Sequence, residues 1–200
     1  MTSALLVAAT LALAGAPASE RAPAWAPREG RELLGTRAPE LRGVEWLQGG
    51  PLTLVGLRGK VVLIRFWLTG CAYCEATAPA LNELHDAYAA KGLVVVGLHH
   101  PKSDETRDRA VVERAARQLG FRFPVGIDPD WKTANAYGVG TVFREFTSVS
   151  ILVDRAGTIR FVHDGGEFHR GGGPEHRACN LAYDALHAAI EQLLFERDKR

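Results

Sequence analysis

Two cysteines separated by two residues are the clearest chemistry-bearing feature of this 200-residue sequence. They form the segment Cys71-Ala72-Tyr73-Cys74, and a third cysteine, Cys179, lies far along the chain. A pair with this spacing can be half of a zinc site or a redox couple. Zinc normally takes a second closely spaced pair as its other ligands, and the sequence has none. The spacing therefore favours a redox couple over a metal site or a purely structural disulfide.

The position of the pair between a strand and a helix points the same way. The apolar run 61–64 predicts a buried strand, and Cys71 opens a helix expected over residues 71–90. Free N–H groups and the macrodipole at a helix N-terminus favour a thiolate over a thiol. We therefore expect Cys71 to attack a substrate sulfur and Cys74, one turn later, to resolve the mixed disulfide.

The rest of the pattern predicts one layered α/β domain over residues 37–200. Further strands are expected at 93–96, 123–127, 150–153 and 158–162, and further helices at 105–119, at 130–137 with Asp130 as its cap, and around 181–193. The last two strands should form a hairpin. The order β-α-β-α-β-α-β-β-α predicts a central mixed β-sheet flanked by helices.

Composition and the N-terminal region indicate an exported protein. Lys and Arg number 24 against 23 Asp and Glu, so no nucleic-acid partner is expected. Residues 1–18 have the features of a signal peptide, with a short apolar run and the cleavage pattern Ala16-Pro17-Ala18. Residues 19–36 are expected to be a flexible tether. The predicted location is periplasmic or secreted, without membrane insertion after cleavage, where a cysteine pair can persist as a disulfide.

Residues 59–67 (GKVVLIRFW), the cysteine pair and Pro79 resemble the TlpA/ResA-like branch of the thioredoxin superfamily. The resemblance begins at residues 38–40 and extends through the strand that ends at Asp154, and residues 96–101 (VGLHHP) are especially similar to DipZ-like members. It implies a thioredoxin-like fold without a cofactor. It also implies protein dithiol and disulfide substrates and a membrane or periplasmic electron donor.

The same resemblance implies the roles of the residues around the pair. The first cysteine is the nucleophile, the second is the resolving thiol, and Trp67 packs beneath the motif. Trp67, Tyr73, Thr147 and Ser148 make up the expected substrate-binding surface. Thioredoxins place a cis-proline opposite the cysteine pair, and Ser148 holds that position here. A non-proline cis bond costs about 2.5–4 kcal/mol, so a trans peptide and altered substrate recognition are expected.

Three more positions depart from the family pattern. Gly70 stands where the family usually has Trp, and Thr77 stands where close relatives have a Glu proposed to handle protons. Arg65 stands where thioredoxins have a buried Asp. A cation beside the sulfurs would lower the pKa of Cys71 and stabilise the reduced form. The alternative is an Arg65 side chain that extends from a strand end into solvent.

Other ligand-type side chains gather in and around the Gly-rich stretch 165–173: His163, Asp164, Glu167, His169, His176 and Cys179. Such a group can bind copper or zinc, but its irregular spacing favours surface histidines, and no metal site is predicted. His99-His100 at a strand end is expected to be a pair of loop histidines, with an approach to the cysteines as the alternative. The third cysteine is expected to be a buried apolar residue or a free thiol without a catalytic role.

Two other functions compete with thiol–disulfide exchange. Peroxiredoxins share the opening Ala38-Pro39, but they have a threonine three residues before the reactive cysteine, where this chain has Leu68. Thr69 is only two residues before Cys71. The other alternative is a copper metallochaperone that uses the cysteine pair and a histidine. Thiol–disulfide exchange remains the leading prediction.

Overall fold

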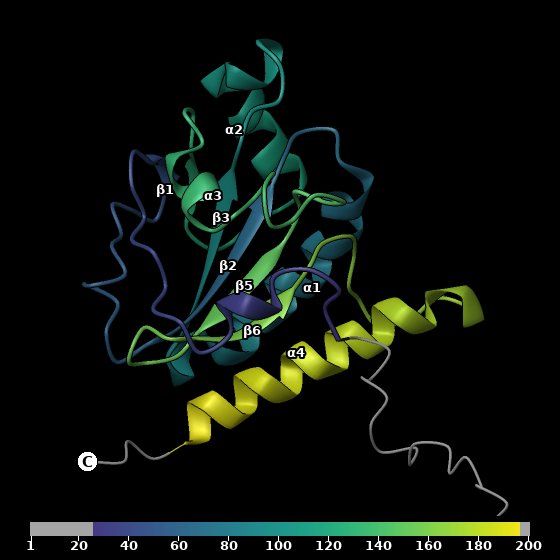
Figure 1. Ribbon diagram of the computed structural model, residues 1–200. Coiled ribbons are helices and arrows are strands. Elements are labelled where there is room, and N and C mark those ends of the chain that lie inside the picture. Colours follow the sequence, from purple (N-terminus) through teal and green to yellow (C-terminus); the bar gives the residue numbers. More distant parts are fainter. Residues whose placement is uncertain (1–25, 197–200) are drawn as a thin grey trace, which may run out of the picture.

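A six-stranded mixed sheet forms the centre of the computed structural model, which describes residues 26–196 (Figure 1). The expected signal peptide, residues 1–18, lies outside the described residues. The strands are β1 (Glu45–Gln48), β2 (Val61–Trp67), β3 (Leu93–His99), β4 (Val125–Ile127), β5 (Ser150–Val153) and β6 (Ile159–His163), in the spatial order β1-β4-β3-β2-β5-β6. Strands β2, β3 and β4 run parallel, and the others pair antiparallel. The expected mixed sheet is confirmed.

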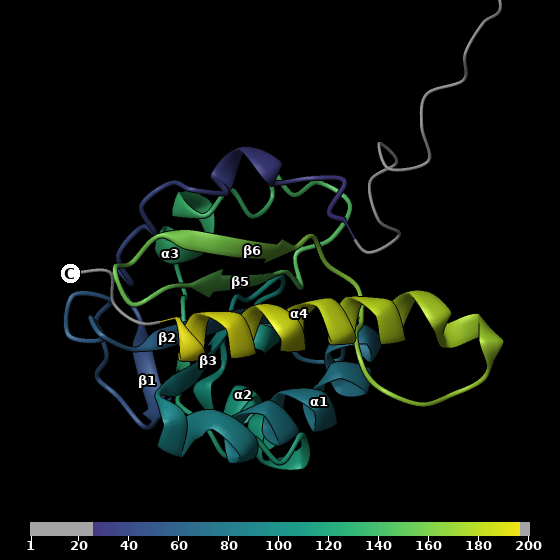
Figure 2. The same ribbon diagram turned by 90° about the horizontal axis from the view of Figure 1, so that it is seen from below.

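Helices cover both faces of this sheet (Figure 2). They are α1 (Ala72–Tyr88), α2 (Arg109–Gln118), α3 (Lys132–Ala136) and α4 (Arg177–Phe195), with short 3₁₀ turns at Arg31–Leu33, Ala89–Lys91, Glu105–Arg107 and Pro174–His176. Helices α1, α2 and α4 pack on one face, and α3 packs on the other with the segment before β1. No helix within residues 26–196 is both long and apolar enough to cross a membrane.

Strand β2 is buried along its whole length because helices lie on both sides of it. Its side chains alternate between the two faces of the sheet. Leu63 and Trp67 pack with α1 and α4, whereas Ile64 and Phe66 pack with α3. Arg65 has the parity of Leu63 and Trp67. The alternation therefore directs a guanidinium into the layer beneath the helix that carries the cysteines.

The first part of the described chain departs from the expected tether. The backbone of Gly35 donates to the carbonyl of Ile159 at 2.8 Å, and the Ile159 amide donates to Thr36 at 2.9 Å. The amide of Arg28 also donates to the Asp164 carboxylate at 2.6 Å. Residues 35–36 thus pair with the outer edge of β6, whose backbone groups are otherwise unpaired, and Arg28 is bonded to the residue just after that strand. Strand β1 was also not predicted, because its four residues, Glu-Trp-Leu-Gln, do not alternate between polar and apolar side chains.

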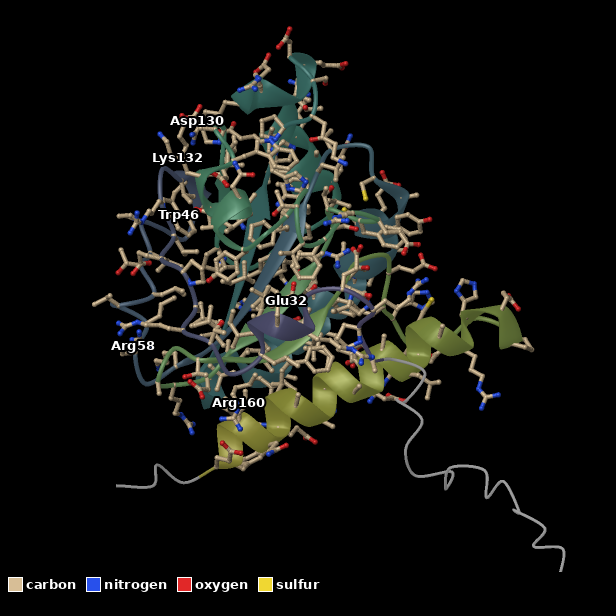
Figure 3. The ribbon with its side chains drawn as sticks, viewed as in Figure 1. Glu32, Trp46, Arg58, Asp130, Lys132 and Arg160 are labelled. Atoms are coloured by element: carbon tan, nitrogen blue, oxygen red, sulfur yellow. The ribbon has the colours of Figure 1, made fainter. Side chains whose placement is uncertain are left out.

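The start of α3 corrects another expectation. Asp130 does not cap this helix, and its carboxylate instead forms an exposed ion pair with Lys132 at 2.9 Å (Figure 3). The fully buried Asp128 accepts a hydrogen bond from the amide of Ala134 at 2.7 Å. The Asp128 amide is tied to the carbonyl of His99 at 2.7 Å, which places its side chain under the helix.

This difference gives a stability prediction. We expect Asp128→Ala to lower the free energy of unfolding by about 1–2 kcal/mol, because a buried amide at the start of α3 loses its acceptor. The matched variant Asp130→Ala removes only an exposed pair and should cost less than about 0.5 kcal/mol. Urea denaturation measures both values. Equal losses in the two variants would contradict the assignment of Asp128 as the helix anchor.

Candidate active site

The two cysteines lie together at the first turn of α1. Cys71 is the N-cap of this helix, with an extended backbone, and its Sγ accepts a hydrogen bond from the amide of Cys74 at 3.3 Å. The thiol of Cys74 donates to the Cys71 Sγ at 2.7 Å. Cys71 is half-buried, whereas Cys74 is 2% exposed. The pair therefore lies at the junction between strand β2 and helix α1, the position expected from the sequence.

The surroundings of the two thiols shift their pKa values in opposite directions. The hydrogen bond from Cys74 is the largest cause that lowers the pKa of Cys71 to about 6, and the Cys74 amide and the Arg65 charge act in the same direction. Burial opposes them. The pKa of Cys74 is raised, because its proton is held by Cys71 and because burial penalises its thiolate. The accessible sulfur is thus the one that ionises.

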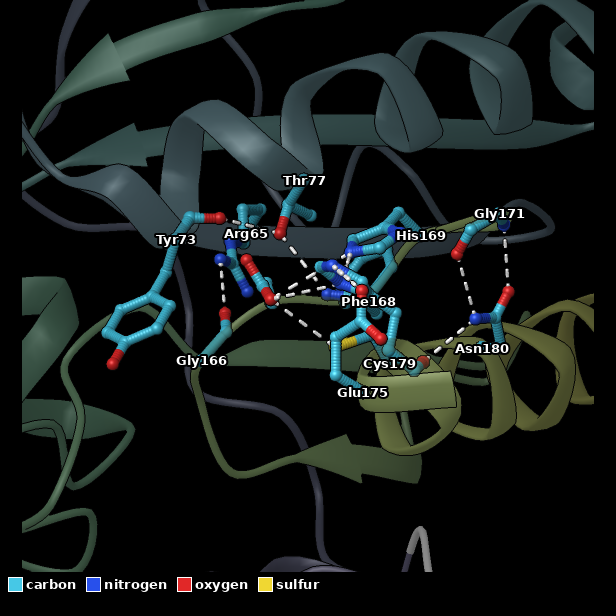
Figure 4. Close-up of polar contacts among 12 residues, drawn as sticks. Arg65, Tyr73, Thr77, Gly166, Phe168, His169, Gly171, Glu175, Cys179 and Asn180 are labelled. Carbon is cyan, nitrogen blue, oxygen red and sulfur yellow. Dashed lines mark hydrogen bonds and ion pairs between the residues drawn. The ribbon is translucent and has the colours of Figure 1, made fainter. Parts of the chain in front are cut away.

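Arg65 is buried beside these sulfurs, which excludes the solvent-exposed alternative. It is 1% exposed, and its guanidinium donates to Ser150 Oγ at 3.2 Å and to the Gly166 carbonyl at 2.9 Å (Figure 4). It also lies 5.5 Å from the centre of the Phe168 ring. Within residues 26–196 no carboxylate forms an ion pair with it, and its main charged partners are the two cysteines. A buried cation without a carboxylate favours a thiolate next to it.

Thr77 ties the active-site helix to the loop after β6. Its hydroxyl donates to the Tyr73 carbonyl at 2.7 Å and accepts from the Phe168 amide at 3.3 Å (Figure 4). The same loop supplies the Gly166 carbonyl that holds Arg65. Thr77 is fully buried. At the position where the family resemblance leads us to expect a Glu, Thr77 therefore forms a structural link.

Trp67 and His99 support the turn that precedes Cys71. Trp67 is fully buried and meets the His99 ring edge-on at 4.9 Å between centres. The Nε2 atom of His99 accepts from the Thr69 amide at 3.3 Å. Burial lowers the pKa of His99 to about 4, which keeps it neutral and able to accept. His99 is thus a support for the cysteine turn. His100 points to the other face of the sheet, where it packs against Trp131.

The residues expected to bind substrate lie around the pair to different extents. Trp67 is buried, so in this structure it supports the motif from beneath without an exposed surface for a partner. Tyr73 is 45% exposed and meets the Phe146 ring edge-on at 5.4 Å. Thr147 is half-buried, and Ser148 is 2% exposed after a trans peptide bond. Of these four residues, only Tyr73 and Thr147 therefore expose side-chain surface to a partner.

A groove of about 610 Å³ lies beside the turn that precedes Cys71, although Cys71 itself does not line it. Its lining residues come from the cysteine turn and from the facing sides of α1 and α2: Leu68, Thr69, Gly70, Glu75, Ala78, Pro79, Ala115, Gln118 and Leu119. Gly70 has a positive φ of 70°, and no atom lies within 4 Å of where its Cβ would be. Open space thus stands where the family resemblance leads us to expect a Trp side chain.

Four ligand-type side chains converge on the loop after β6, in contrast to the expectation of separate surface histidines. They are Glu167, His169, His176 and Cys179, hereafter the four-ligand cluster, and their ligand atoms lie within 4.8 Å of one another. His163 does not join it, because it ends β6 and is buried against Phe168. Burial is the first of the causes that raise the pKa of Cys179. Neither Cys71 nor Cys74 belongs to the cluster.

Comparison with known proteins places the chain in a family. A model of the AhpC/TSA family matches residues 34–162, which include the cysteine pair. The chain belongs to the AhpC/TSA family. This AhpC/TSA chain is 34% identical over 139 residues to the protein DipZ of Mycobacterium bovis, across 67% of this chain and 19% of DipZ. It is 33% identical over 134 residues to the thiol-disulfide oxidoreductase ResA of Geobacillus thermodenitrificans, across 66% of this chain and 70% of ResA.

Solved structures agree with these sequence matches. A candidate thiol:disulfide interchange protein DsbE from Chlorobium tepidum superposes with a TM-score of 0.63 at 25% identity, over 80% of this chain and 97% of that one. The thioredoxin-like superfamily protein SPOA0173 gives 0.61 at 27% identity over the same shares. The thioredoxin-like fold and the resemblance to ResA-like and DipZ-like proteins are thereby confirmed. The AhpC/TSA chain spans about a fifth of the length of DipZ and about two thirds of ResA.

The ionisation of Cys71 can be followed by its alkylation. The rate at Cys71 should be constant at high pH and fall about tenfold per unit below an apparent pKa of about 6, because only the thiolate reacts. Cys74→Ala should raise that pKa by more than one unit towards the free value of about 8.5, since the largest stabilising contact is lost. Mass spectrometry of the Cys71 peptide reads the rate separately from Cys179.

Cys74→Ser is the matched control for this measurement, because a hydroxyl still donates to the Cys71 sulfur. It should raise the pKa less than Cys74→Ala does. Indistinguishable pKa values in the wild type and Cys74→Ala would show that the thiol–thiolate contact does not set the acidity of Cys71.

Proposed function

We propose that this AhpC/TSA chain is a thiol–disulfide oxidoreductase that exchanges electrons with protein dithiols and disulfides. The observation that carries the proposal is the contact between the sulfurs, in which a buried Cys74 thiol stabilises a half-buried Cys71 thiolate. A nucleophile that ionises below neutral pH beside a protonated resolving thiol is what disulfide exchange requires. The ResA relative is itself named as a thiol-disulfide oxidoreductase.

The reaction follows from the two pKa values. In the reducing direction, the Cys71 thiolate attacks one substrate sulfur, a mixed disulfide forms, and the other substrate sulfur leaves as a thiolate and takes up a proton. The Cys74 thiol then loses its proton and attacks the Cys71 sulfur, which releases the second substrate thiol. The substrate has then gained two electrons and two protons, one proton from Cys74 and one from solvent, and a Cys71–Cys74 disulfide remains. The reverse sequence oxidises a dithiol.

Substrate chains are proposed to bind across the two hollows beside Cys71. The groove between α1 and α2 is mostly apolar, and the absence of a side chain at Gly70 leaves its entrance open. On the other side Tyr73 and Phe146 border a second hollow, next to Thr147 and Ser148 in the chain. A partner strand that lies against residues 147–148 would present its sulfur to Cys71. The buried Ser148 side chain leaves the backbone as the contact at that position.

The protein is further proposed to work after export, in the periplasm or outside the cell, with a membrane or periplasmic electron donor. The support is the apolar run and cleavage pattern within residues 1–18. N-terminal sequencing of the protein recovered from the periplasmic or extracellular fraction tests this proposal. It should begin at Ser19, and recovery of the uncleaved chain from the cytosol alone would refute it.

A thiol peroxidase is the second candidate, because the Ala38-Pro39 opening is shared with peroxiredoxins. The structure offers it little support at the cysteines. Thr69 is the nearest threonine before Cys71. Its hydroxyl lies 3.2 Å from His99 Nε2 and is taken up by that hydrogen bond. The copper-carrier alternative needs a histidine beside Cys71 and Cys74. The four-ligand cluster contains two histidines but neither of these cysteines, so it does not support that alternative.

Substitution of each cysteine distinguishes the roles of the pair. With insulin as the disulfide substrate, Cys71→Ser should lower the rate at least about a hundredfold, because the nucleophile is lost. Cys74→Ser should instead accumulate a mixed disulfide between Cys71 and the substrate, since nothing resolves it. Reduction is followed by insulin turbidity, and the trapped species by non-reducing electrophoresis with mass spectrometry.

Peroxide turnover is the comparison that separates the two candidates. Wild-type activity retained in Cys71→Ser would refute thiol–disulfide exchange through this pair. Rapid formation of a sulfenic acid at Cys71 with catalytic consumption of micromolar peroxide, and no insulin reduction, would favour the peroxidase instead.

A further inference from the structure

The loop between β6 and α4 brings together side chains that the exchange reaction does not use. We propose that the four-ligand cluster binds one zinc ion, at a site separate from the cysteine pair. The ligands come from three turns of chain: Glu167 and His169 from the loop, His176 from the 3₁₀ turn, and Cys179 from the first turn of α4. Figure 4 shows these segments facing one another.

The spacing of the ligand atoms matches a tetrahedral zinc site. With metal–ligand bonds of about 2.0–2.3 Å, tetrahedral ligands lie roughly 3.3–3.7 Å from one another. His169 Nε2 lies 3.2 Å from His176 Nδ1, and the Cys179 Sγ lies 3.4 Å from Glu167 Oε1. Both imidazole nitrogens lie 3.8 Å from the same carboxylate oxygen. All four ligand atoms lie within 4.8 Å of one another, so small side-chain movements would bring them to bonding distance from one ion.

The types of the ligands select the metal. One thiolate, two imidazoles and one carboxylate are a donor set that zinc accepts. Calcium and magnesium take oxygen ligands almost alone, and soft Cu(I) prefers sulfur ligands to a carboxylate. Four protein ligands leave no open position, which is typical of a structural site. Bound zinc would tie the loop to the start of α4.

The loop is held in a shape that keeps these ligands together. The Asn180 side chain accepts from the Gly171 amide at 2.9 Å and donates to the carbonyls of Gly171 at 3.0 Å and His176 at 2.8 Å (Figure 4). The Phe168 amide is fixed to Thr77 on α1. Glu175 Oε1 lies 3.8 Å from Nε2 of His176, the ring nitrogen that the cluster does not use, and a small movement would make it the carboxylate partner that zinc-bound histidines have.

The ligand side chains are accessible enough for an ion to enter. Their exposed fractions are 17% for His169, 25% for Glu167 and 36% for His176. The loop that carries them also carries the Gly166 carbonyl that binds Arg65. Zinc at the cluster would therefore stabilise the segment that positions Arg65, without any ligand from the exchanging sulfurs.

Zinc binding is tested in a background where the cysteine pair cannot take part. The double variant Cys71→Ser/Cys74→Ser should retain one Zn²⁺ per chain after dialysis, and a chromophoric chelator competition gives its affinity. Co²⁺ in place of Zn²⁺ should give the visible bands of a tetrahedral site and a sulfur-to-cobalt charge-transfer band. Adding Cys179→Ser should remove the charge-transfer band and weaken Zn²⁺ at least about tenfold, and adding His169→Ala should weaken it similarly.

His187→Ala in the same background is the matched control, because this histidine lies on α4 but hydrogen-bonds with Tyr88. Its zinc affinity should equal that of the double variant. If the double variant is unstable, wild-type protein with Cys71–Cys74 oxidised to a disulfide supplies an equivalent background. If the background protein used does not retain Zn²⁺, the proposal is overturned. Unchanged Zn²⁺ affinity after Cys179→Ser and His169→Ala would also overturn it. Neither result would alter the test of thiol exchange.

Discussion

The buried charge of Arg65 is the constraint around which the proposed exchange site is built. Strand alternation sends this guanidinium under α1, and no carboxylate within residues 26–196 pairs with it there. A thiolate at Cys71 relieves that imbalance, while the Cys74 thiol and amide supply the hydrogen bonds that a thiolate accepts best. The acidity of Cys71 is thus a property of strand, helix and loop together, because the Gly166 carbonyl holds the guanidinium in place.

Much of this arrangement could be predicted from the sequence because it depends on local pattern. The strand-to-helix position of the cysteines follows from a buried run and a helix start, and the hairpin follows from its turn residues. The orientation of Arg65 could also have been predicted from the sequence. It lies two residues before Trp67 on the same strand, so the alternation of side chains places both on one face of the sheet. Since Trp67 was expected to pack beneath the cysteine motif, Arg65 could be expected to lie on that same face.

What the sequence could not supply depends on contacts between distant segments. Residues 28–36 were expected to be a free tether, but residues 35–36 pair with the edge of β6, a partner more than a hundred residues away. Asp130 looked like the cap of α3, yet a hydrogen bond to the end of β3 gives that position to Asp128. The convergence of the four-ligand cluster could not be predicted for the same reason. Its ligands are irregularly spaced along a Gly-rich loop, and this spacing does not indicate which side chains face each other.

The loop after β6 links the two chemical centres of the molecule. It contacts Thr77 and Arg65 on one side and presents the four-ligand cluster on the other. In this chain the elements that set the acidity of Cys71 and those that gather the ligands are therefore anchored through one segment.

The reduction potential of the Cys71–Cys74 couple, titrated against glutathione buffers at pH 7, tests the role of Arg65 most directly. A buried cation stabilises the thiolate, hence the reduced form, so Arg65→Met should shift the potential to more negative values by on the order of 10–30 mV. Arg65→Lys, which keeps the charge, should shift it less. A potential that is unchanged in Arg65→Met, or more positive, would contradict the account.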